Sequence, residues 1–156
     1  MADLSVEYIN PFLMAATSVI KDICQIEVKI GRPYVKTTEF EGNSVIIMIG
    51  VTGEVRGQVL ISFQYEHALK VASKMMMGMP ITELDDMSAS AINELGNMIM
   101  GNAATILSTK GIGMDITPPT LCRGNVYFKQ SYSKNICIPL TSDEIKMELD
   151  IAVNMD

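Results

Sequence analysis

The first third of the chain begins with apolar residues spaced as on one face of a helix. They recur every three or four positions from about Val6 to Ile23, at Ile9, Phe12, Leu13, Ala16, Val19, Ile20 and Ile23, and this spacing predicts a helix. Pro11 leaves two alternatives for where it starts. If Asn10 caps the helix, Pro11 is a favourable first helical residue; if the helix begins near Ser5, Pro11 kinks it or lies in its first turns.

The rest of the chain predicts two more helices separated by β-rich runs. One helix is expected at 65–77, ended by Gly78 and Pro80, and a longer one at 87–109, closed by Gly111. Runs of alternating or β-branched residues predict the strands. These are 33–38, 44–51, 54–63, 115–117, 121–130, 135–140 and 145–153, with hairpin turns at Thr52-Gly53 and Ser142-Asp143.

The helix expected at 87–109 is amphipathic. Asp85, Asp86 or Ser88 supplies its N-cap and acidic first turn. At about 100° per residue, one broad face is apolar and should pack on the core. It carries Ser88, Ala91, Ile92, Leu95, Ile99 and Ile106.

The opposite face of this helix carries the candidate site. Ser90, Glu94, Asn97 and Gly101 stack one turn above another at spacings of four, three and four residues. An exposed Glu and Asn at this spacing are, alone, typical of a solvated helix surface. Gly101 is unusual because glycine costs about 1 kcal/mol relative to alanine inside a helix. We interpret it as room for another surface to approach.

A faint internal repeat relates the two halves of the chain. The hairpin strand 55–63 aligns with 145–153, and Pro33 aligns with Pro119 at nearly the same offset. At an offset of 87 residues, Asp3, Glu7 and Asn10 align with Ser90, Glu94 and Asn97. Each half is then a helix, a proline-marked strand and a hairpin, so the two halves could share one sheet covered by helices. Chance matching of short motifs is the alternative.

Composition narrows the class of protein. A length of 156 residues with 48% hydrophobic residues predicts one folded domain, residues 1–156. A net charge of −6 opposes binding to nucleic acid or anionic lipid. No apolar stretch approaches the roughly 20 residues of a membrane span. Asp3 and Glu7 stand where a signal peptide would be basic, so we expect a cytoplasmic protein.

The sequence offers few groups for metal or nucleophilic chemistry. Cys24, Cys122 and Cys137 form no CxxC pair, and His67 is the one histidine, which favours buried thiols over a disulfide or a zinc site. The chain contains no GxGxxG motif, no Walker loop and no nucleophile elbow. We therefore expect neither a disulfide scaffold nor a zinc site nor a phosphate-cradling loop.

These residues belong to a longer pattern that resembles a known family. Ser90, Glu94 and Asn97 lie in SASAINELGNMIMGNAATILS, and Pro119 follows in DITPPTL. This combination resembles the signature of the CheC, CheX and FliY family of bacterial chemotaxis phosphatases, and IGVTGEVRGQVLISF and HALKVASKMMMGM extend the likeness to its CheX members. The resemblance implies a three-layer α/β sandwich, mostly antiparallel with helices packed on the sheet and an internal pseudo-twofold repeat, and a homodimer.

The resemblance also implies an activity. Members of this family remove phosphate from the phospho-aspartate of a CheY-type response regulator. Carried to matching positions, Glu94 contacts the regulator's active-site lysine and Asn97 orients the attacking water. Ser90, Gly101 and Pro119 support the site. The Mg²⁺ belongs to the phosphorylated regulator, so the chain itself needs no cofactor.

Two alternatives stay open. The chain could be a noncatalytic interaction module of the chemotaxis or flagellar switch system, since the related FliM domain lacks the phosphatase signature. Glu7 and Asn10 could form a second site, as in two-site relatives. Pro11 beside Asn10 favours a capping or kinking role instead, and the first copy lacks the ELGN context of the second.

Overall fold

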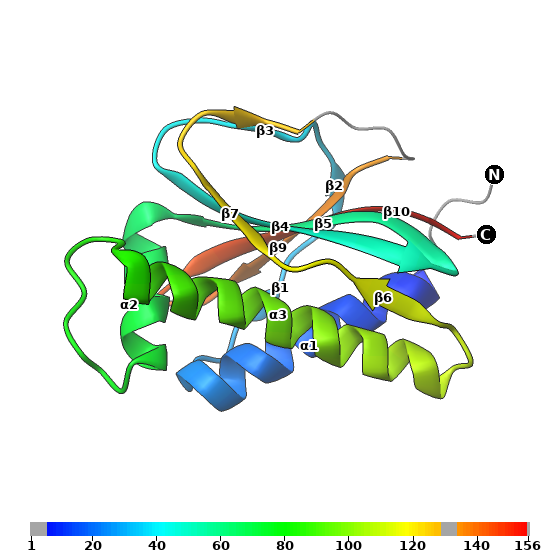
Figure 1. Ribbon diagram of the computed structural model, residues 1–156, viewed down its shortest axis with the longest axis horizontal. Coiled ribbons are helices and arrows are strands. Elements are labelled where there is room, and N and C mark those ends of the chain that lie inside the picture. Colours follow the sequence, from blue (N-terminus) through cyan, green and yellow to red (C-terminus); the bar gives the residue numbers. More distant parts are fainter. Residues whose placement is uncertain (1–5, 129–133, 156) are drawn as a thin grey trace.

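The computed structural model describes residues 6–128 and 134–155. Within these residues, α1 (Val6–Cys24) and α3 (Asp86–Thr109) lie side by side against one face of a sheet, and α2 (Tyr65–Met75) packs at one end of the same layer (Figure 1). The opposite face carries a small two-stranded sheet. The three-layer, mostly antiparallel arrangement expected from the sequence is therefore confirmed.

The main sheet has eight strands in the described part of the chain. Its order is β1-β9-β10-β5-β4-β6, β2 also pairs with β9, β7 also pairs with β4, and β3 and β8 form the small sheet. Every pairing is antiparallel. The strands are β1 (Lys29–Ile30), β2 (Tyr34–Val35), β3 (Glu39–Phe40), β4 (Ser44–Gly53), β5 (Val55–Gln64), β6 (Met114–Ile116), β7 (Thr120–Arg123), β8 (Val126–Tyr127), β9 (Ile136–Thr141) and β10 (Lys146–Met155).

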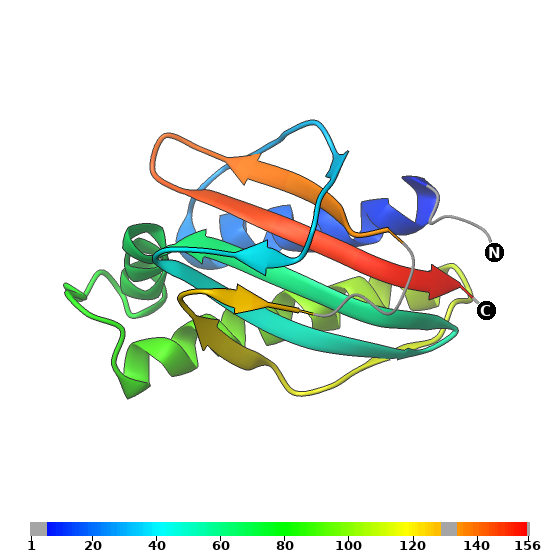
Figure 2. The ribbon, with the colours of Figure 1, turned by 90° about the horizontal axis from the view of Figure 1, so that it is seen from above.

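The internal repeat is visible in the strand order. The long strands β5 and β10 pair at the centre of the sheet, with β4 and β9 outside them (Figure 2). The short strands are exchanged: β1 and β2 of the first half pair with β9, and β6 and β7 of the second half pair with β4. Leu60 faces Asp150 in the central register, and these are equivalent positions of the two halves. The two halves therefore complete one another's sheet, which explains why they form a single core.

The predicted helices and hairpins are found within one or two residues, with two corrections among the strands. The first hairpin turns at Glu54, because Val51 pairs with Gly57, so the turn predicted at Thr52-Gly53 was placed too early. The strand predicted at 121–130 is divided into β7 and β8. Gly124 still donates its N–H to the Ser44 carbonyl at the start of β4. Its φ of 84° then turns the chain away from β4. Residues 129–130 lie outside the described part.

Helix α1 decides between the alternatives left by Pro11. The helix begins at Val6, so Asn10 lies inside it and is not its N-cap. Pro11 is buried in the second turn, followed by the buried Phe12. The alternative with an early helix start is correct.

The core lies between the helices and the sheet, and one glycine lets α3 approach closely. A Cβ on Gly96 would lie 2.8 Å from Cγ2 of Ile47 on β4. Leu95 and Ile99 on either side are fully buried in the same core. Gly96 therefore sets the distance between the sheet and the helix that carries the candidate site.

The thiols are mostly buried, as expected. Cys24 and Cys137 are buried and Cys122 is half-buried. Burial raises the pKa of the Cys24 thiol to about 11 and also raises the pKa of Cys122. These side chains stay protonated at neutral pH and are poor nucleophiles.

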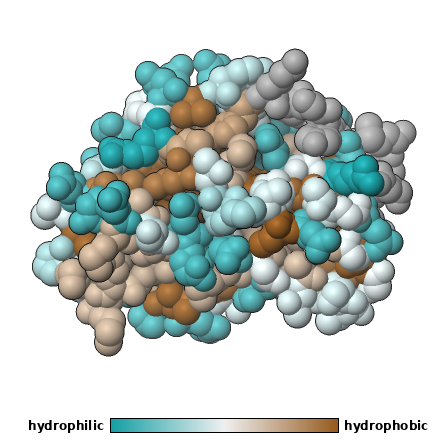
Figure 3. Space-filling view, viewed as in Figure 1, coloured by the Kyte–Doolittle hydropathy of each residue, from teal (hydrophilic) through white to brown (hydrophobic). Residues whose placement is uncertain are grey.

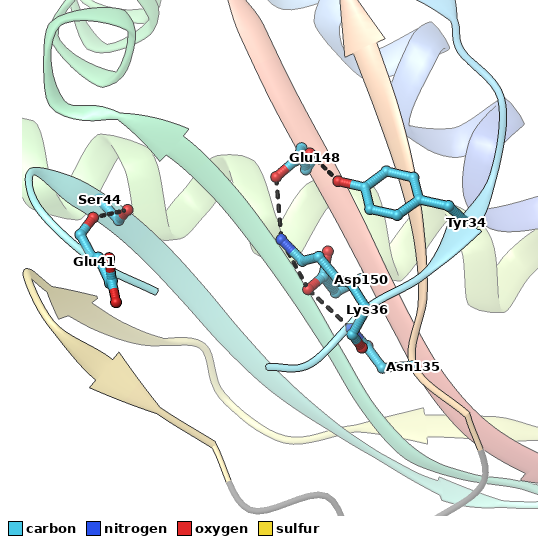
Figure 4. Close-up of polar contacts among 7 residues, drawn as sticks. All are labelled: Tyr34, Lys36, Glu41, Ser44, Asn135, Glu148 and Asp150. Atoms are coloured by element: carbon cyan, nitrogen blue, oxygen red, sulfur yellow. Dashed lines mark hydrogen bonds and ion pairs between the residues drawn. The ribbon is translucent and has the colours of Figure 1, made fainter. Parts of the chain in front are cut away.

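A polar cluster ties the β2 segment to β10 on the helix-free face of the sheet (Figure 4). Lys36 Nζ lies 3.2 Å from Glu148 Oε1 and 3.6 Å from Asp150 Oδ2. Tyr34 donates to Glu148 at 2.9 Å, and Asn135 donates to Asp150 at 3.1 Å. Burial raises the pKa of Asp150 although Lys36 opposes it. Burial acts upward on Glu148 too, but the Tyr34 hydrogen bond and Lys36 bring its pKa below the usual value.

Candidate functional site

The start of α3 is fixed by a reciprocal cap. Ser88 donates its N–H to Asp85 Oδ1 at 2.9 Å, and Asp85 donates its N–H to Ser88 Oγ at 2.8 Å. Of the three candidates, Asp85 is therefore the N-cap, and Ser88 is its buried partner. The hydrogen bonds from Ser88 lower the pKa of Asp85. The cap therefore fixes the residue at which α3 begins.

The rotation of α3 presents the predicted face to solvent. Ile92, Leu95 and Ile99 are 0% exposed, so the helix is anchored by its apolar stripe. On the other side, Ser90, Glu94 and Asn97 are exposed. A Cβ added at Gly101 would meet nothing within 4 Å.

Residues 116–119 form a second wall beside this face. Thr117 donates its N–H to the Gly50 carbonyl at 2.9 Å, and its Oγ1 accepts from the Gly50 N–H at 2.8 Å. A Cβ on Gly50 would lie 3.0 Å from Thr117 Cγ2, so glycine makes this approach possible. The two bonds hold Pro118 and Pro119 next to α3, at the edge of β4.

Between the two walls lies an open groove. It is lined by Ser90, Asn93, Glu94, Asn97, Ile116, Thr117, Pro118 and Pro119. Ser90, Glu94, Asn97 and Pro119 were expected from the sequence, and the structure brings these four together. Gly101 lies one turn beyond Asn97 and does not line the groove.

Sequence reasoning missed Asn93 and Thr117. Asn93 is one turn before Asn97, and its Oδ1 is buried with no hydrogen-bond partner in the described part of the chain. Its place beside Glu94 at the edge of the polar face was the available signal. Thr117 had no such signal in the sequence, because its two hydrogen bonds with Gly50 depend on how distant strands pair.

The residues of the possible second site are only partly described. Asn10 is exposed on α1, while the side chain of Glu7 and all of Asp3 lie outside the described residues. Gly31 donates its N–H to the Pro139 carbonyl at 2.7 Å, which is the counterpart of the bond from Thr117 to Gly50. The backbone of the second wall is thus repeated in the first half, but with Gly31, Arg32 and Pro33 in place of the Thr117-Pro118-Pro119 run.

Two features are absent from the described residues. No three side chains of His, Cys, Asp or Glu lie close enough there to hold a metal ion. No helix among residues 6–128 and 134–155 is long and apolar enough to cross a membrane. The groove itself offers one carboxylate, two carboxamides and two hydroxyls. These groups can pair with a cation and hydrogen-bond a water or a phosphate.

The strand-exchanged sheet with its paired helices defines the CheC-like class of fold. The structure is similar to a CheC-like superfamily protein from Shewanella sp. PV-4, with a TM-score of 0.86, 28% identity, and coverage of 97% of this chain and 99% of that chain. It is also similar to the crystal structure of a CheX–CheY–BeF₃–Mg²⁺ complex from Borrelia burgdorferi, with a TM-score of 0.76, 35% identity, and coverage of 96% and 99%.

Sequence comparison specifies the family further. The pattern of the family Chemotaxis phosphatase CheX matches residues 45–141, which include the whole groove. The chain is 37% identical over 133 residues to the CheY-P phosphatase CheX of Thermotoga maritima, covering 85% of this chain and 86% of that protein. The chain belongs to the CheX family.

Proposed function

We propose that this protein hydrolyses the phospho-aspartate of a CheY-type response regulator, using Asn97 to orient the attacking water and Glu94 to contact the regulator. The observation that carries the proposal is the groove, in which Ser90, Glu94, Asn97 and Pro119 meet on the solvent side of α3. Its Thermotoga relative is named a CheY-P phosphatase, and its Borrelia relative was crystallised with CheY, BeF₃ and Mg²⁺.

The reaction needs positioning more than a strong base. Water attacks phosphorus as the bond to the aspartyl oxygen breaks, which releases the carboxylate, inorganic phosphate and a proton. The transition state is loose, so fixing the water in line supplies much of the acceleration. The Asn97 carboxamide can accept a hydrogen bond from that water and donate one to a phosphoryl oxygen.

Glu94 has a different task. It lies one turn before Asn97 on the same face and carries the negative charge of the groove. A carboxylate there pairs with the lysine in the regulator's active site and aligns the two proteins. Ser90 and Pro119 shape the two walls of the groove.

The Mg²⁺ of this reaction belongs to the regulator. Regulator carboxylates hold it, and it neutralises charge on the phosphoryl group. Glu94 is the one carboxylate among the residues that line the groove of this chain. We further propose one domain over residues 1–156 and a homodimer, and a cytoplasmic location stays a prediction.

The test is the rate at which a purified CheY-type regulator from the same organism loses its phosphate in Mg²⁺ buffer, with and without this protein. Acceleration supports the phosphatase. Binding without acceleration, with regulators tried one by one, supports the alternative of a noncatalytic interaction module.

Glu94→Gln should weaken binding of the phosphorylated regulator more than it lowers the maximal rate of phosphate release. Removing one charge from an interfacial ion pair costs affinity and association rate. We expect the half-saturating concentration of phosphorylated regulator to rise about threefold to tenfold, with a smaller change in the maximal rate. A concentration series measures both. A loss confined to the maximal rate would contradict a charge-contact role.

Gly101→Leu should separate folding from docking. A Cβ added there would meet nothing within 4 Å, and leucine is the better helix former, so the free energy of unfolding should rise by about 0.5–1 kcal/mol. If the regulator passes close to this turn, the half-saturating concentration should nevertheless rise about fivefold, by steric exclusion of the partner. Chemical denaturation and the phosphate-release assay measure the two effects. Unchanged kinetics would show that the partner does not approach Gly101.

A further inference from the structure

Three exposed methionine side chains lie on the connection between α2 and α3 and in the first turn of α3. The exposed fractions are 98% for Met77, 53% for Met79 and 67% for Met87. Figure 3 shows apolar side chains gathered at the lower left of the molecule, over the connection between α2 and α3 and the start of α3. Single exposed apolar residues are common, but a group of large ones beside a functional groove marks an interaction surface.

The segment that carries these methionines is held in place. Gly78 donates its N–H to the Ser73 carbonyl at 2.8 Å, and the Ser73 hydroxyl donates to the Met79 carbonyl at 2.7 Å. Farther along, Leu84 donates its N–H to the Tyr65 hydroxyl at 2.9 Å. A partner therefore meets a preformed surface, and little backbone entropy is lost on binding.

The methionine-bearing segment meets the groove at Met87. Met87 precedes Ser90 by three residues and Glu94 by seven, so the three share one face of α3. At 1.5 Å per residue, Met87 lies roughly 15 Å along the helix from Asn97. A standard interface covers about 800 Å² on each partner, a patch roughly 30 Å across. A regulator whose phospho-aspartate sits over Asn97 thus reaches Met87.

We propose that Met77, Met79 and Met87 form the apolar part of the docking surface for the phosphorylated response regulator. This inference rests on the proposed function and adds to it a source of affinity separate from the residues of the reaction. The flexible, polarizable methionine side chain adapts to an irregular apolar patch. Exposed acidic residues border the surface, so the complementary region of the partner is apolar with a basic edge. They are Glu83, Asp85 and Asp86.

The test is binding of the regulator activated with beryllofluoride and Mg²⁺, a stable stand-in for the phosphorylated form. The triple variant Met77→Gln, Met79→Gln, Met87→Gln should bind about tenfold more weakly, because glutamine removes the apolar contact at similar size. The matched control is Met14→Gln, which changes a methionine that is 57% exposed on α1. The control should bind like the wild type.

The dependence of binding on ionic strength and the maximal rate of phosphate release give two further readouts. The loss in the triple variant should be the same at low and high ionic strength, since apolar contacts are not screened, whereas a charge contact at Glu94 weakens with salt. At saturating regulator, the triple variant should release phosphate at the wild-type maximal rate. Wild-type affinity in the triple variant would overturn the inference.

The same binding and turnover measurements also distinguish a failure of the methionine surface from a failure of the proposed function on which it rests. If Asn97→Ala abolishes turnover while the triple variant binds normally, only the methionine surface is wrong. If the wild-type protein binds the activated regulator but releases no phosphate, the phosphatase proposal fails and the binding data still judge the methionines.

Discussion

Asn97→Ala should lower the rate of regulator dephosphorylation by at least about 100-fold, because removing one positioned hydrogen-bonding group from a transition state typically has this effect. Asn97 is exposed and lies opposite the buried stripe of α3, so the substitution should leave the fold intact. The circular dichroism spectrum and the denaturation midpoint should match the wild type. The loss therefore reports the reaction and not the stability of the helix.

Asn102→Ala is the matched control for that experiment. Asn102 is an exposed asparagine on the same helix, but it does not line the groove. It should retain the wild-type rate. Equal losses in the two variants would point to a general effect on α3, and an unchanged rate in Asn97→Ala would remove Asn97 from the reaction.

Gly96→Val should displace α3 and the site residues that it carries, because Gly96 lies on the side of the helix that faces the sheet. The first added carbon already lies 2.8 Å from Cγ2 of Ile47, so valine must push α3 away from β4. Overpacking of this kind costs about 1–3 kcal/mol of unfolding free energy. A displacement of about 1 Å at a reacting group can cost 100-fold in rate, and we expect at least a tenfold loss. Urea denaturation and phosphate release measure the two effects.

Gly101→Val is the stability control for Gly96→Val. It makes the same chemical change on the same helix at a position where an added Cβ meets nothing within 4 Å. Its unfolding free energy should equal or exceed that of the wild type. If both glycine variants lost stability to the same extent, valine in the helix would be the cause and the close contact with Ile47 would not.

The sequence predicted the main elements of the site because a helix has a regular period. Spacings of four and three residues placed Ser90, Glu94 and Asn97 on one face, and the buried positions Ile92 and Leu95 confirm the rotation. Pro119 could not be reached by periodicity. It lies on a separate segment, and only the family resemblance connected it with the helix.

What the sequence left out depends on contacts between distant segments. The exchange of short strands between the halves leaves no local signal, and neither does the pair of bonds from Thr117 to Gly50 that holds the second wall. The Lys36, Glu148 and Asp150 cluster also brings together residues far apart in the chain. The break at Gly124 went unseen because a glycine within a β-rich run is also compatible with a bulge.

The most direct measurement is the decay of phosphate from a phosphorylated CheY-type regulator of the same organism, in Mg²⁺ buffer, alone, with the wild-type protein and with Asn97→Ala. We expect the wild type to accelerate the decay. The variant, although folded and still able to bind the beryllofluoride-activated regulator, should not accelerate it. Equal acceleration by both proteins would contradict the assigned site. No acceleration by the wild type, with binding intact, would contradict the phosphatase and leave an interaction module.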